Sequence, residues 1–446
     1  MQPDWDAVEK ETALLLRRML RFDTTNLPGN ELPLARDLAE ELQAEGFEPE
    51  VLVSGEGRGN LALRCKGDGT RRPLLLLSHL DVVPAEAGQW THPPFAGEVA
   101  DGYVWGRGAI DSKLTTAVQL EVVRLCRRLK LPLQRDLVLV AAADEERGGV
   151  YGMQWLLRHR PDLFEVEYGI NEAGGFALMV GGRPLYTCQV AEKGGAEIDL
   201  VAPGRPGHAS VPHGENPIVR LGPALERLGG RLPHRPPPSV TAFFEAAAAA
   251  QDNPEAATML RAALEADAWE KARDRLPADE ATRLMFDAML RDTCAPTMLE
   301  AGLKRNVIPS EATVRLSGRP LPGTGRDAFV AQVEALAGPG VESRLHSFRP
   351  GVEFPHQTPL FDALGEALRR VEPGAAMVPY LQTGGTDARF LAGGGATVYG
   401  FIPMRHEAVP GFFELCHGHD ERVSLANLRF AVQVLFEAVK ILNGIA

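Results

Sequence analysis

Acidic residues and a histidine stand where several predicted strands give way to loops. These residues are His79, Asp81, Asp111, Glu145, Glu146 and Glu172, and a second histidine, His417, lies just before the last predicted helix. In parallel α/β sheets, ligands collect at the carboxyl ends of the strands. Imidazole nitrogens and carboxylate oxygens bind zinc, and two metals about 3.5–4 Å apart can share a carboxylate and a water. The pattern therefore predicts a two-metal hydrolytic site, with one further acid free to take a proton.

Taken singly, each of these residues has an explanation that needs no metal. His79-Leu80-Asp81 could be a hydrogen-bonded pair, Glu145-Glu146 the solvated start of a helix, Asp111 an N-cap, Glu172 a turn residue and His417 a surface-loop residue. All of them except His417 fall at strand-to-loop transitions, and this coincidence favours one metal site over five separate explanations.

The segments that must position these residues alternate between helix and strand patterns. Apolar residues recur at helical spacing in three segments, and nearly continuous apolar runs predict strands that are buried on both faces. The helical segments are 5–22, 32–45 and 115–128, and the strands are 73–78, 136–142 and 166–170. This alternation predicts an α/β fold with a mostly parallel sheet.

The pattern changes after about Val190. Strands are predicted at 196–202, 298–303 and 312–316, with helices at 218–228 and 327–336 and an alanine-rich helical stretch at 255–290. The first pattern resumes from Pro359. We therefore predict a discontinuous domain, 1–190 and 352–446, interrupted by an inserted α+β domain, 191–351.

Composition excludes several classes of partner. The formal charge is −12, from 47 basic and 59 acidic residues, whereas nucleic-acid binding needs a basic surface. The five cysteines are scattered, without the spacing of a disulfide framework or a thiolate zinc site, which suits a reducing compartment. No signal-peptide pattern opens the chain, and no apolar run is long enough to span a membrane. We expect a cytoplasmic protein with no nucleic-acid and no membrane partner.

Seven motifs, in order along most of the chain, resemble those of one enzyme family. They are Ser78–Pro84, Gly106–Lys113, Asp144–Glu146, Asn171–Gly175, Gly207–Ser210, Asn306–Pro309 and His417–Arg422. The chain resembles the dizinc metallopeptidase family of aminoacylase, carboxypeptidase G, acetylornithine deacetylase, succinyl-diaminopimelate desuccinylase and carnosinase.

The resemblance implies a role for each residue of the predicted site. His79, Asp111 and Glu172 would bind one zinc ion, and Asp111, Glu146 and His417 the other, so that Asp111 bridges two ions per chain. Cobalt or manganese can occupy similar sites. Asp81 would hold the second nitrogen of His79. Glu145 would be the general base that takes a proton from the metal-held water and passes it to the leaving amine.

The resemblance also makes the inserted domain a lid and dimerisation domain. His208 would reach the partner subunit's active site and stabilise an oxyanion, and Arg319 would bind the substrate carboxylate. Asn306 would hydrogen-bond the same substrate, and Gly384, Gly385 and Thr386 would form a backbone cradle. Each residue also has a plainer explanation: His208 as a loop histidine, Arg319 as a solvated arginine at a strand end, and Gly384 to Thr386 as an ordinary turn. Gly318 stands where the family often has Asp, which weakens the assignment of Arg319.

The expected activity is dizinc-dependent hydrolysis of the amide bond in N-acyl amino acids or short peptides that carry a free carboxylate. The expected assembly is a homodimer. One alternative is a dipeptidase or aminopeptidase of the same family, which would recognise a free amine instead. An alternative of another class is a metal-bound peptide-binding protein without catalysis.

Overall fold

The computed structural model describes residues 3–407 and 411–445 and divides into two compact units. Unit 1 comprises Met1–Val190, Phe354–Pro379 and Thr386–Ala446, and unit 2 comprises Ala191–Glu353 and Tyr380–Gly385. Within the described ranges, no helix has the length and apolar character that crossing a bilayer requires.

Unit 1 contains a sheet whose central strands run parallel. Its strand order is β1-β2-β6-β3-β7-β18-β9, with parallel pairing of β6 with β3, β3 with β7 and β7 with β18. The outer pairs β1–β2, β2–β6 and β8–β9 are antiparallel. These strands are β1 (Glu50–Gly55), β2 (Arg58–Cys65), β3 (Leu74–His79), β6 (Leu137–Ala142), β7 (Tyr168–Asn171), β8 (Ala177–Val180), β9 (Arg183–Glu192), β17 (Ala376–Gln382) and β18 (Thr397–Gly400). The predicted α/β class with a largely parallel central sheet is confirmed.

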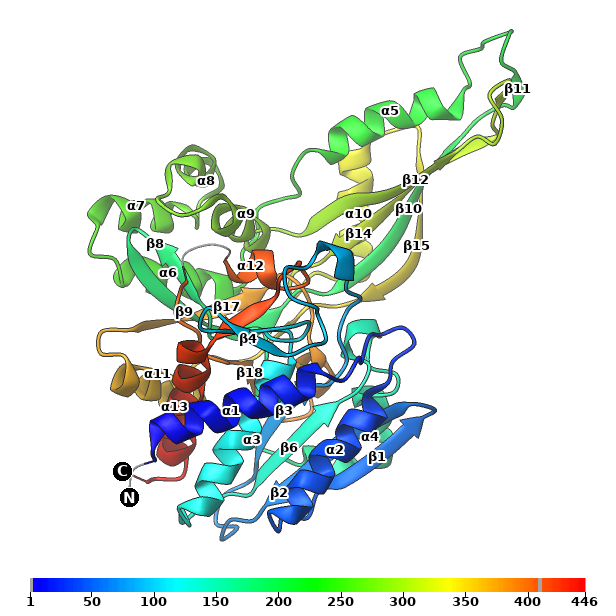
Figure 1. Cartoon of the computed structure of the whole chain (residues 1–446). Helices are drawn as coiled ribbons and strands as arrows, with labels where there is room; N and C mark the ends of the chain where they lie inside the picture. Colours follow the sequence, from blue (N-terminus) through cyan, green and yellow to red (C-terminus); the bar gives the residue numbers. More distant parts are fainter. Residues whose placement is uncertain (1–2, 408–410, 446) are drawn as a thin grey trace. The chain divides into compact units, whose positions relative to one another are not determined.

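Helices bury the apolar strands of this sheet. Every residue of β3 and β6 is buried, and α3 packs against both strands, while α1 and α13 pack against α3 (Figure 1). The helices of unit 1 are α1 (Trp5–Leu20), α2 (Glu31–Ala44), α3 (Lys113–Arg128), α4 (Met153–His159), α11 (Pro359–Val371), α12 (Phe412–Leu415) and α13 (Leu425–Leu442). A small sheet of β4 (Glu98–Ala100), β5 (Tyr103–Trp105) and β19 (Arg422–Ser424) joins the loop before α3 to the segment before α13.

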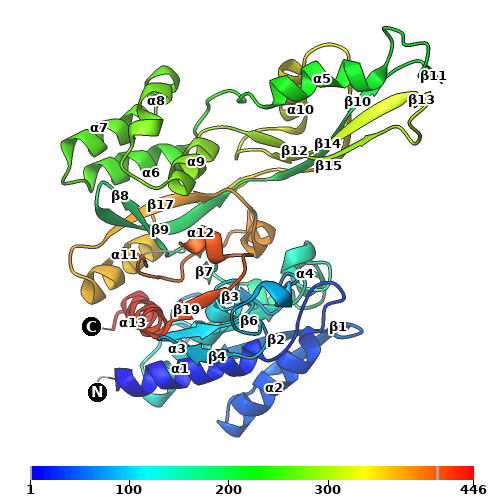
Figure 2. The same cartoon turned by 45° about the horizontal axis from the view of Figure 1, so that its top comes forward.

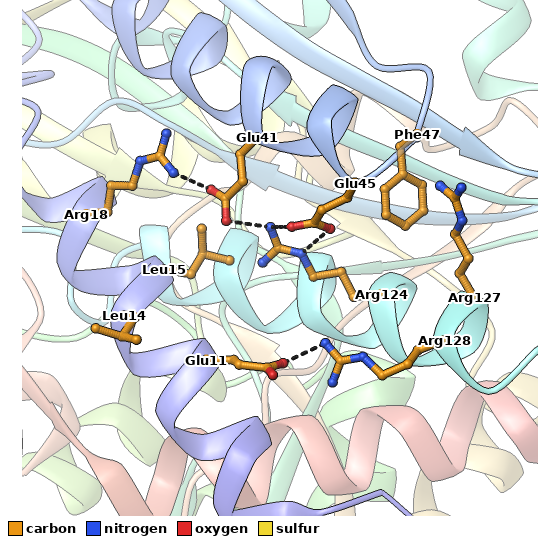
Figure 3. Close-up of a pocket in the computed structure, with 10 residues that line it drawn as sticks. All are labelled: Glu11, Leu14, Leu15, Arg18, Glu41, Glu45, Phe47, Arg124, Arg127 and Arg128. Carbon is orange, nitrogen blue, oxygen red and sulfur yellow. Dashed lines mark hydrogen bonds and ion pairs between the residues drawn. The ribbon is translucent and has the colours of Figure 1, made fainter.

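A groove of about 680 Å³ lies among α1, α2 and α3 and is lined by four arginines (Figure 3). Three of them pair with glutamates: Arg18 with Glu41 at 2.6 Å, Arg124 with Glu45 at 2.7 Å and Arg128 with Glu11 at 2.7 Å. Arg127 instead lies over the Phe47 ring, 4.3 Å from its centroid. The ion pairs link the three helices and neutralise three of the four arginines, so we assign this groove to helix packing.

Unit 2 contains an antiparallel sheet of order β12-β14-β10-β15 with α5 and α10 packed on it. Phe329 and Leu316 belong to the shared apolar core. The elements are β10 (Gly195–Pro203), β11 (Gly207–His208), α5 (Pro217–Leu228), β12 (Thr293–Ala301), β13 (Val307–Ile308), β14 (Glu311–Arg319), α10 (Arg326–Ala337), β15 (Glu342–Arg349) and β16 (Val352–Glu353).

Unit 2 also carries a helical group with its own aromatic core. It consists of α6 (Pro238–Ala249), α7 (Pro254–Ala262), α8 (Ala266–Ala272) and α9 (Glu280–Met289). Phe244 packs on Trp269 and Phe286, with ring centroids 6.0 and 5.3 Å apart. The stretch 255–290 is thus three helices with two breaks. Pro277 lies in the second break, after which Asp279 caps α9 by accepting a hydrogen bond from Thr282 N.

Candidate metal centre

The predicted ligands meet at the carboxyl edge of the parallel strands. His79 ends β3 and lies opposite Ala142 at the end of β6, so the loop with Glu145 and Glu146 starts beside it. Glu172 directly follows β7, which pairs with β3 on its other side. Because parallel strands end at one edge, residues far apart in sequence become neighbours.

Asp111 lies between two histidines. Its Oδ1 is 3.0 Å from His79 Nε2, and its Oδ2 is 3.0 Å from His417 Nε2. Glu172 Oε2 lies 3.1 Å from His79 Nε2, and Glu146 Oε1 lies 3.3 Å from His417 Nε2. The five predicted ligands therefore form two triads that share one carboxylate.

This donor set suits two divalent cations. Two imidazoles and three carboxylates are ligands that zinc accepts. Glu146 Oε1 is buried and faces His417 Nε2 at 3.3 Å, so a cation held between the two atoms would satisfy both. Distances within 4.8 Å also group Glu145 with His79 and Glu172, and Cys416 with Asp111 and His417. The Cys416 thiol donates to Asp111 Oδ2 at 3.2 Å, and burial raises its pKa well above the ordinary value, which favours the neutral thiol.

The pKa shifts of the histidines and of Asp111 indicate how strongly the groups of the cluster interact. Hydrogen bonds to Asp111 and Glu146 raise the pKa of His417 to about 10. Burial alone would lower the pKa of His79, but the Glu172 charge and hydrogen bonds to Asp111 and Asp81 raise it well above its ordinary value. Burial opposes ionisation of Asp111, yet His417 and His79 hold its pKa far below the usual range. Positive charge, from protons or metal ions, is what stabilises carboxylates packed this closely.

Glu145 lies beside the two triads and contacts the guanidinium of Arg389. Its Oε1 is 3.3 Å from Arg389 Nη1. Burial, followed by the charges of Asp387 and Glu172, raises the pKa of Glu145 well above its ordinary value. A carboxylate whose proton affinity is increased in this way is suited to accept a proton during a reaction.

Asp81 fixes both the histidine and the glutamate loop. His79 Nδ1 is 2.9 Å from the Asp81 carbonyl oxygen and 3.4 Å from its carboxylate Oδ1. The carboxylate accepts hydrogen bonds from Glu145 N at 3.0 Å, Glu146 N at 3.1 Å and Asn26 Nδ2 at 2.8 Å. The backbone of Asp81 is therefore the nearer partner of the His79 ring, while its side chain orients the two glutamates.

We expect Asp81→Asn to lower metal affinity or kcat by about 10- to 100-fold, as loss of an outer partner of a ligand usually does. The amide nitrogen cannot accept the hydrogen bonds that the loop donates. Equilibrium zinc titration and steady-state kinetics measure the effect, with Asp101→Asn in an exposed turn as control. Wild-type affinity and turnover in Asp81→Asn would show that the loop does not need this carboxylate.

Glu421 is a positioning residue that the sequence did not reveal. It is fully buried, and its carboxylate accepts hydrogen bonds from Gly108 N at 3.0 Å, Ile110 N at 2.7 Å and Asp111 N at 2.9 Å. Arg107 donates to it at 2.7 Å and to Gly418 O at 2.9 Å. The loop that carries Asp111 is thereby tied to the loop that carries His417. The only sequence signal was the position of Glu421 within the His417–Arg422 motif.

Asp387, Arg389 and Asn26 were also missed. Both carboxylate oxygens of Asp387 are buried without a hydrogen-bond partner among the described residues, and burial raises its pKa to about 7. Asp387 directly follows Thr386, in the loop after β17, so the strand-end argument could have found it. Nothing local distinguishes Asn26, whose partner Asp81 lies 55 residues away.

The remaining predicted residues divide between the units. Thr386 belongs to unit 1 and accepts a hydrogen bond from Asn171 Nδ2 at 3.0 Å. The preceding residue, Gly385, belongs to unit 2. His208 pairs with Val307 in the β11–β13 ladder, next to Asn306.

Arg319 ends β14 and lies opposite Thr293 of β12. The preceding Gly318 is explained by packing, because an added Cβ would lie 2.6 Å from the Phe329 ring. The departure from the family pattern at Gly318 therefore reflects the core of unit 2.

Known proteins resemble the chain in sequence and in fold. It is 26% identical to the probable carboxypeptidase S-like 2 of Dictyostelium discoideum, covering 85% of this chain and 74% of that protein. It is 28% identical to the N-fatty-acyl-amino acid synthase/hydrolase PM20D1 of Xenopus tropicalis, covering 82% and 72%.

Solved structures show the same fold. The M20 family metallo-carboxypeptidase Sso-CP2 of Sulfolobus solfataricus matches with a TM-score of 0.70 at 19% identity, over 97% of this chain and 99% of that one. The Bacillus subtilis YXEP protein, described as a dinuclear metal binding peptidase, matches with a TM-score of 0.61 at 16% identity, over 99% and 100%. Residues 75–441 match the model of peptidase family M20/M25/M40, so the chain belongs to this family of hydrolases that act on amide bonds.

Proposed function

We propose that the protein is a two-zinc hydrolase that cleaves the amide of an N-acyl amino acid or short peptide next to a free carboxylate. The observation that carries the proposal is the position of Asp111, with one oxygen 3.0 Å from His79 and the other 3.0 Å from His417. A carboxylate in this position could supply one oxygen to each of two metal ions. A cytoplasmic location is part of the proposal and is supported by five free cysteines.

Bound zinc would polarise the scissile carbonyl and lower the pKa of the attacking water. His79, Asp111 and Glu172 would hold one ion, and Asp111, Glu146 and His417 would hold the other. Glu145 takes the proton of the water at a carboxylate oxygen and delivers it to the leaving nitrogen. Burial raises the pKa of Glu145, which favours proton acceptance, and a bound cation nearby would lower that pKa and favour release of the proton to the leaving nitrogen.

Recognition of a free carboxylate is supported by the names of two relatives, a carboxypeptidase and an amino-acid N-acyl hydrolase. Arg319 supplies a guanidinium that can hold both carboxylate oxygens. Asn306, Gly385 and Thr386 would contribute polar contacts to the same substrate. Substrates blocked at the amine separate this proposal from an aminopeptidase or dipeptidase: the proposed enzyme hydrolyses them, and an enzyme that reads a free amine does not.

His208 is suited to donate a hydrogen bond to an oxyanion. Its Nδ1 accepts from Ser210 N at 3.2 Å and lies 2.6 Å from Ser210 Oγ. Acceptance at Nδ1 places the proton of the neutral ring on Nε2, which is then a donor. Removing one such donor to an oxyanion typically costs about 100- to 1,000-fold in kcat.

The length of unit 2 favours a contribution of His208 to the partner subunit. In Figure 2 the β11–β13 pair lies at one end of this unit and the helices α6–α9 at the other. The β11–β13 end adjoins Glu311, and the eight residue steps from Glu311 to Arg319 span about 26 Å. In an N-acyl amino acid, only the nitrogen and Cα separate the scissile carbonyl from the carboxylate, so one substrate does not bridge this distance between an oxyanion donor and a carboxylate partner. If both residues serve one substrate, they come from different copies, which supports a homodimer.

We expect His208→Ala to lower kcat by about 100-fold or more without loss of metal or of the dimer. Equal mixing with the Glu145→Gln variant should then restore about a quarter of wild-type activity, because half of the dimers are mixed and each has one complete site. Activity of the mixture is measured after subunit exchange, with each variant alone as control. No recovery in dimers shown to have exchanged would contradict the arrangement in trans.

A further inference from the structure

Three cationic side chains converge at one end of the unit 2 sheet. Arg349 is the cross-strand partner of Gly195, and an added Cβ on Gly195 would lie 3.0 Å from its Nη2. On its other side, the strand of Gly195 pairs with β14. Ala196 is the partner of Gly318, and Gly194 N donates a hydrogen bond to Pro320 O at 2.8 Å, so Arg319 lies opposite Gly195. Cross-strand partners share one face of a sheet. Arg319 and Arg349 therefore flank the same glycine on the same face.

Lys193 completes the cluster. It is buried, 2% exposed, and its Nζ donates to Thr293 Oγ1 at 3.1 Å. Thr293 is the cross-strand partner of Arg319, so the lysine reaches the same face. Burial lowers the pKa of Lys193 to about 7, with the Asp292 charge opposing the shift and the Arg319 charge adding to it. Partial burial of the guanidinium and the charge of Arg349 likewise lower the pKa of Arg319.

No acidic side chain among the described residues pairs directly with the two arginines of the cluster. In the ranges 3–407 and 411–445, neither Arg319 nor Arg349 forms an ion pair or a side-chain hydrogen bond. The nearby Asp292 already accepts hydrogen bonds from Leu321 N at 2.6 Å and Thr324 Oγ1 at 2.9 Å. Arg319 and Arg349 lie on one face with a single strand between them, so their charges repel, and an anion between them would relieve the repulsion.

We propose that Arg349 and Arg319, across Gly195, form a two-arginine binding site for a carboxylate, with Lys193 beneath it. The inference rests on the proposed function in taking this carboxylate to be the one on the substrate. Arg349 thereby becomes a specificity-determining residue alongside Arg319. The absent side chain at Gly195 leaves room for the Arg349 guanidinium, because an added Cβ would lie 3.0 Å from its Nη2.

The test compares Arg349→Met with Arg344→Met, an exposed arginine on the same strand, β15. Both are assayed on N-acyl leucine of the chain length that wild type hydrolyses fastest, and on the carboxamide of that compound. Arg349→Met should lower kcat/KM for the acid by about tenfold or more and change the carboxamide rate less than twofold. Equal behaviour of Arg349→Met and Arg344→Met overturns the inference.

Failure of the proposed function gives a different result. In that case wild type hydrolyses no acyl leucine, and the cluster is tested by titrating the chelator-treated protein with N-acetyl-L-leucine. Binding that is weaker in Arg349→Met than in Arg344→Met supports the carboxylate site. Binding that is equal in the two variants, or absent in wild type, overturns it.

Discussion

Replacing Glu145 by glutamine should lower kcat by about 1,000- to 10,000-fold while two metal ions per chain remain bound. Glutamine keeps the shape of the side chain and its contact with Arg389 but cannot accept a proton at neutral pH. The five ligands are unchanged, and Asp81 still receives the backbone hydrogen bonds of the glutamate loop. The measurements are single-turnover kinetics and metal analysis of the same preparation.

Glu86→Gln is a suitable control, because Glu86 is an exposed residue of the same unit. It should retain wild-type turnover and metal content. Turnover of Glu145→Gln within about tenfold of wild type would exclude Glu145 as the general base. Loss of both metals from this variant would instead assign it to the ligands, which its grouping with His79 and Glu172 makes a real alternative.

Replacing Asp111 by asparagine should remove at least one metal ion and lower activity by at least about 1,000-fold. An amide has one oxygen that can bind a metal, whereas its nitrogen can only donate. One of the two histidines would therefore lose the oxygen that now lies 3.0 Å from its Nε2. Metal analysis after dialysis and kcat at saturating zinc give the two readings.

Asp101→Asn in an exposed turn controls for the loss of a carboxylate as such. Thermal unfolding of the chelated proteins shows whether the fold of Asp111→Asn is intact. A folded Asp111→Asn protein that holds two zinc ions and turns over at the wild-type rate would be incompatible with a bridging role for Asp111.

The strand-to-loop pattern could name the candidate ligands because its signals are local. The leucines of β3 and the apolar residues of β6 predict buried parallel strands, and an acid or histidine directly after such a strand lies at the carboxyl edge. The residues that follow β3, β6 and β7 could therefore be predicted to lie together without any information on long-range contacts.

The supports of the site could not be found in this way, because their partners are distant in sequence. Glu421 binds the backbone at Asp111, 310 residues away, and Arg389 contacts Glu145, 244 residues away. A single sequence carries no sign of such pairs. The register of β14 and β15 with β10, which places Arg349 near Arg319, is likewise set by tertiary pairing.

The helical stretch 255–290 shows a different limit. Composition and propensity predicted helix, but not where the chain would turn. Pro277 and the cap at Asp279 mark one break, whereas the break before α8 at Ala266 has no comparable signal. Packing around Trp269, which is fully buried, accounts for the position of α8.

The central claim is best tested by hydrolysis assays on zinc-loaded protein of known metal content. The substrates are amine-blocked N-acyl amino acids, their carboxamides and unblocked dipeptides. We predict two zinc ions per chain, hydrolysis of the N-acyl amino acids and a preference of about tenfold or more for the free acid over the carboxamide. Two bound zinc ions with no hydrolysis anywhere in this panel, or with hydrolysis only of substrates that have a free amine, would contradict the proposed function.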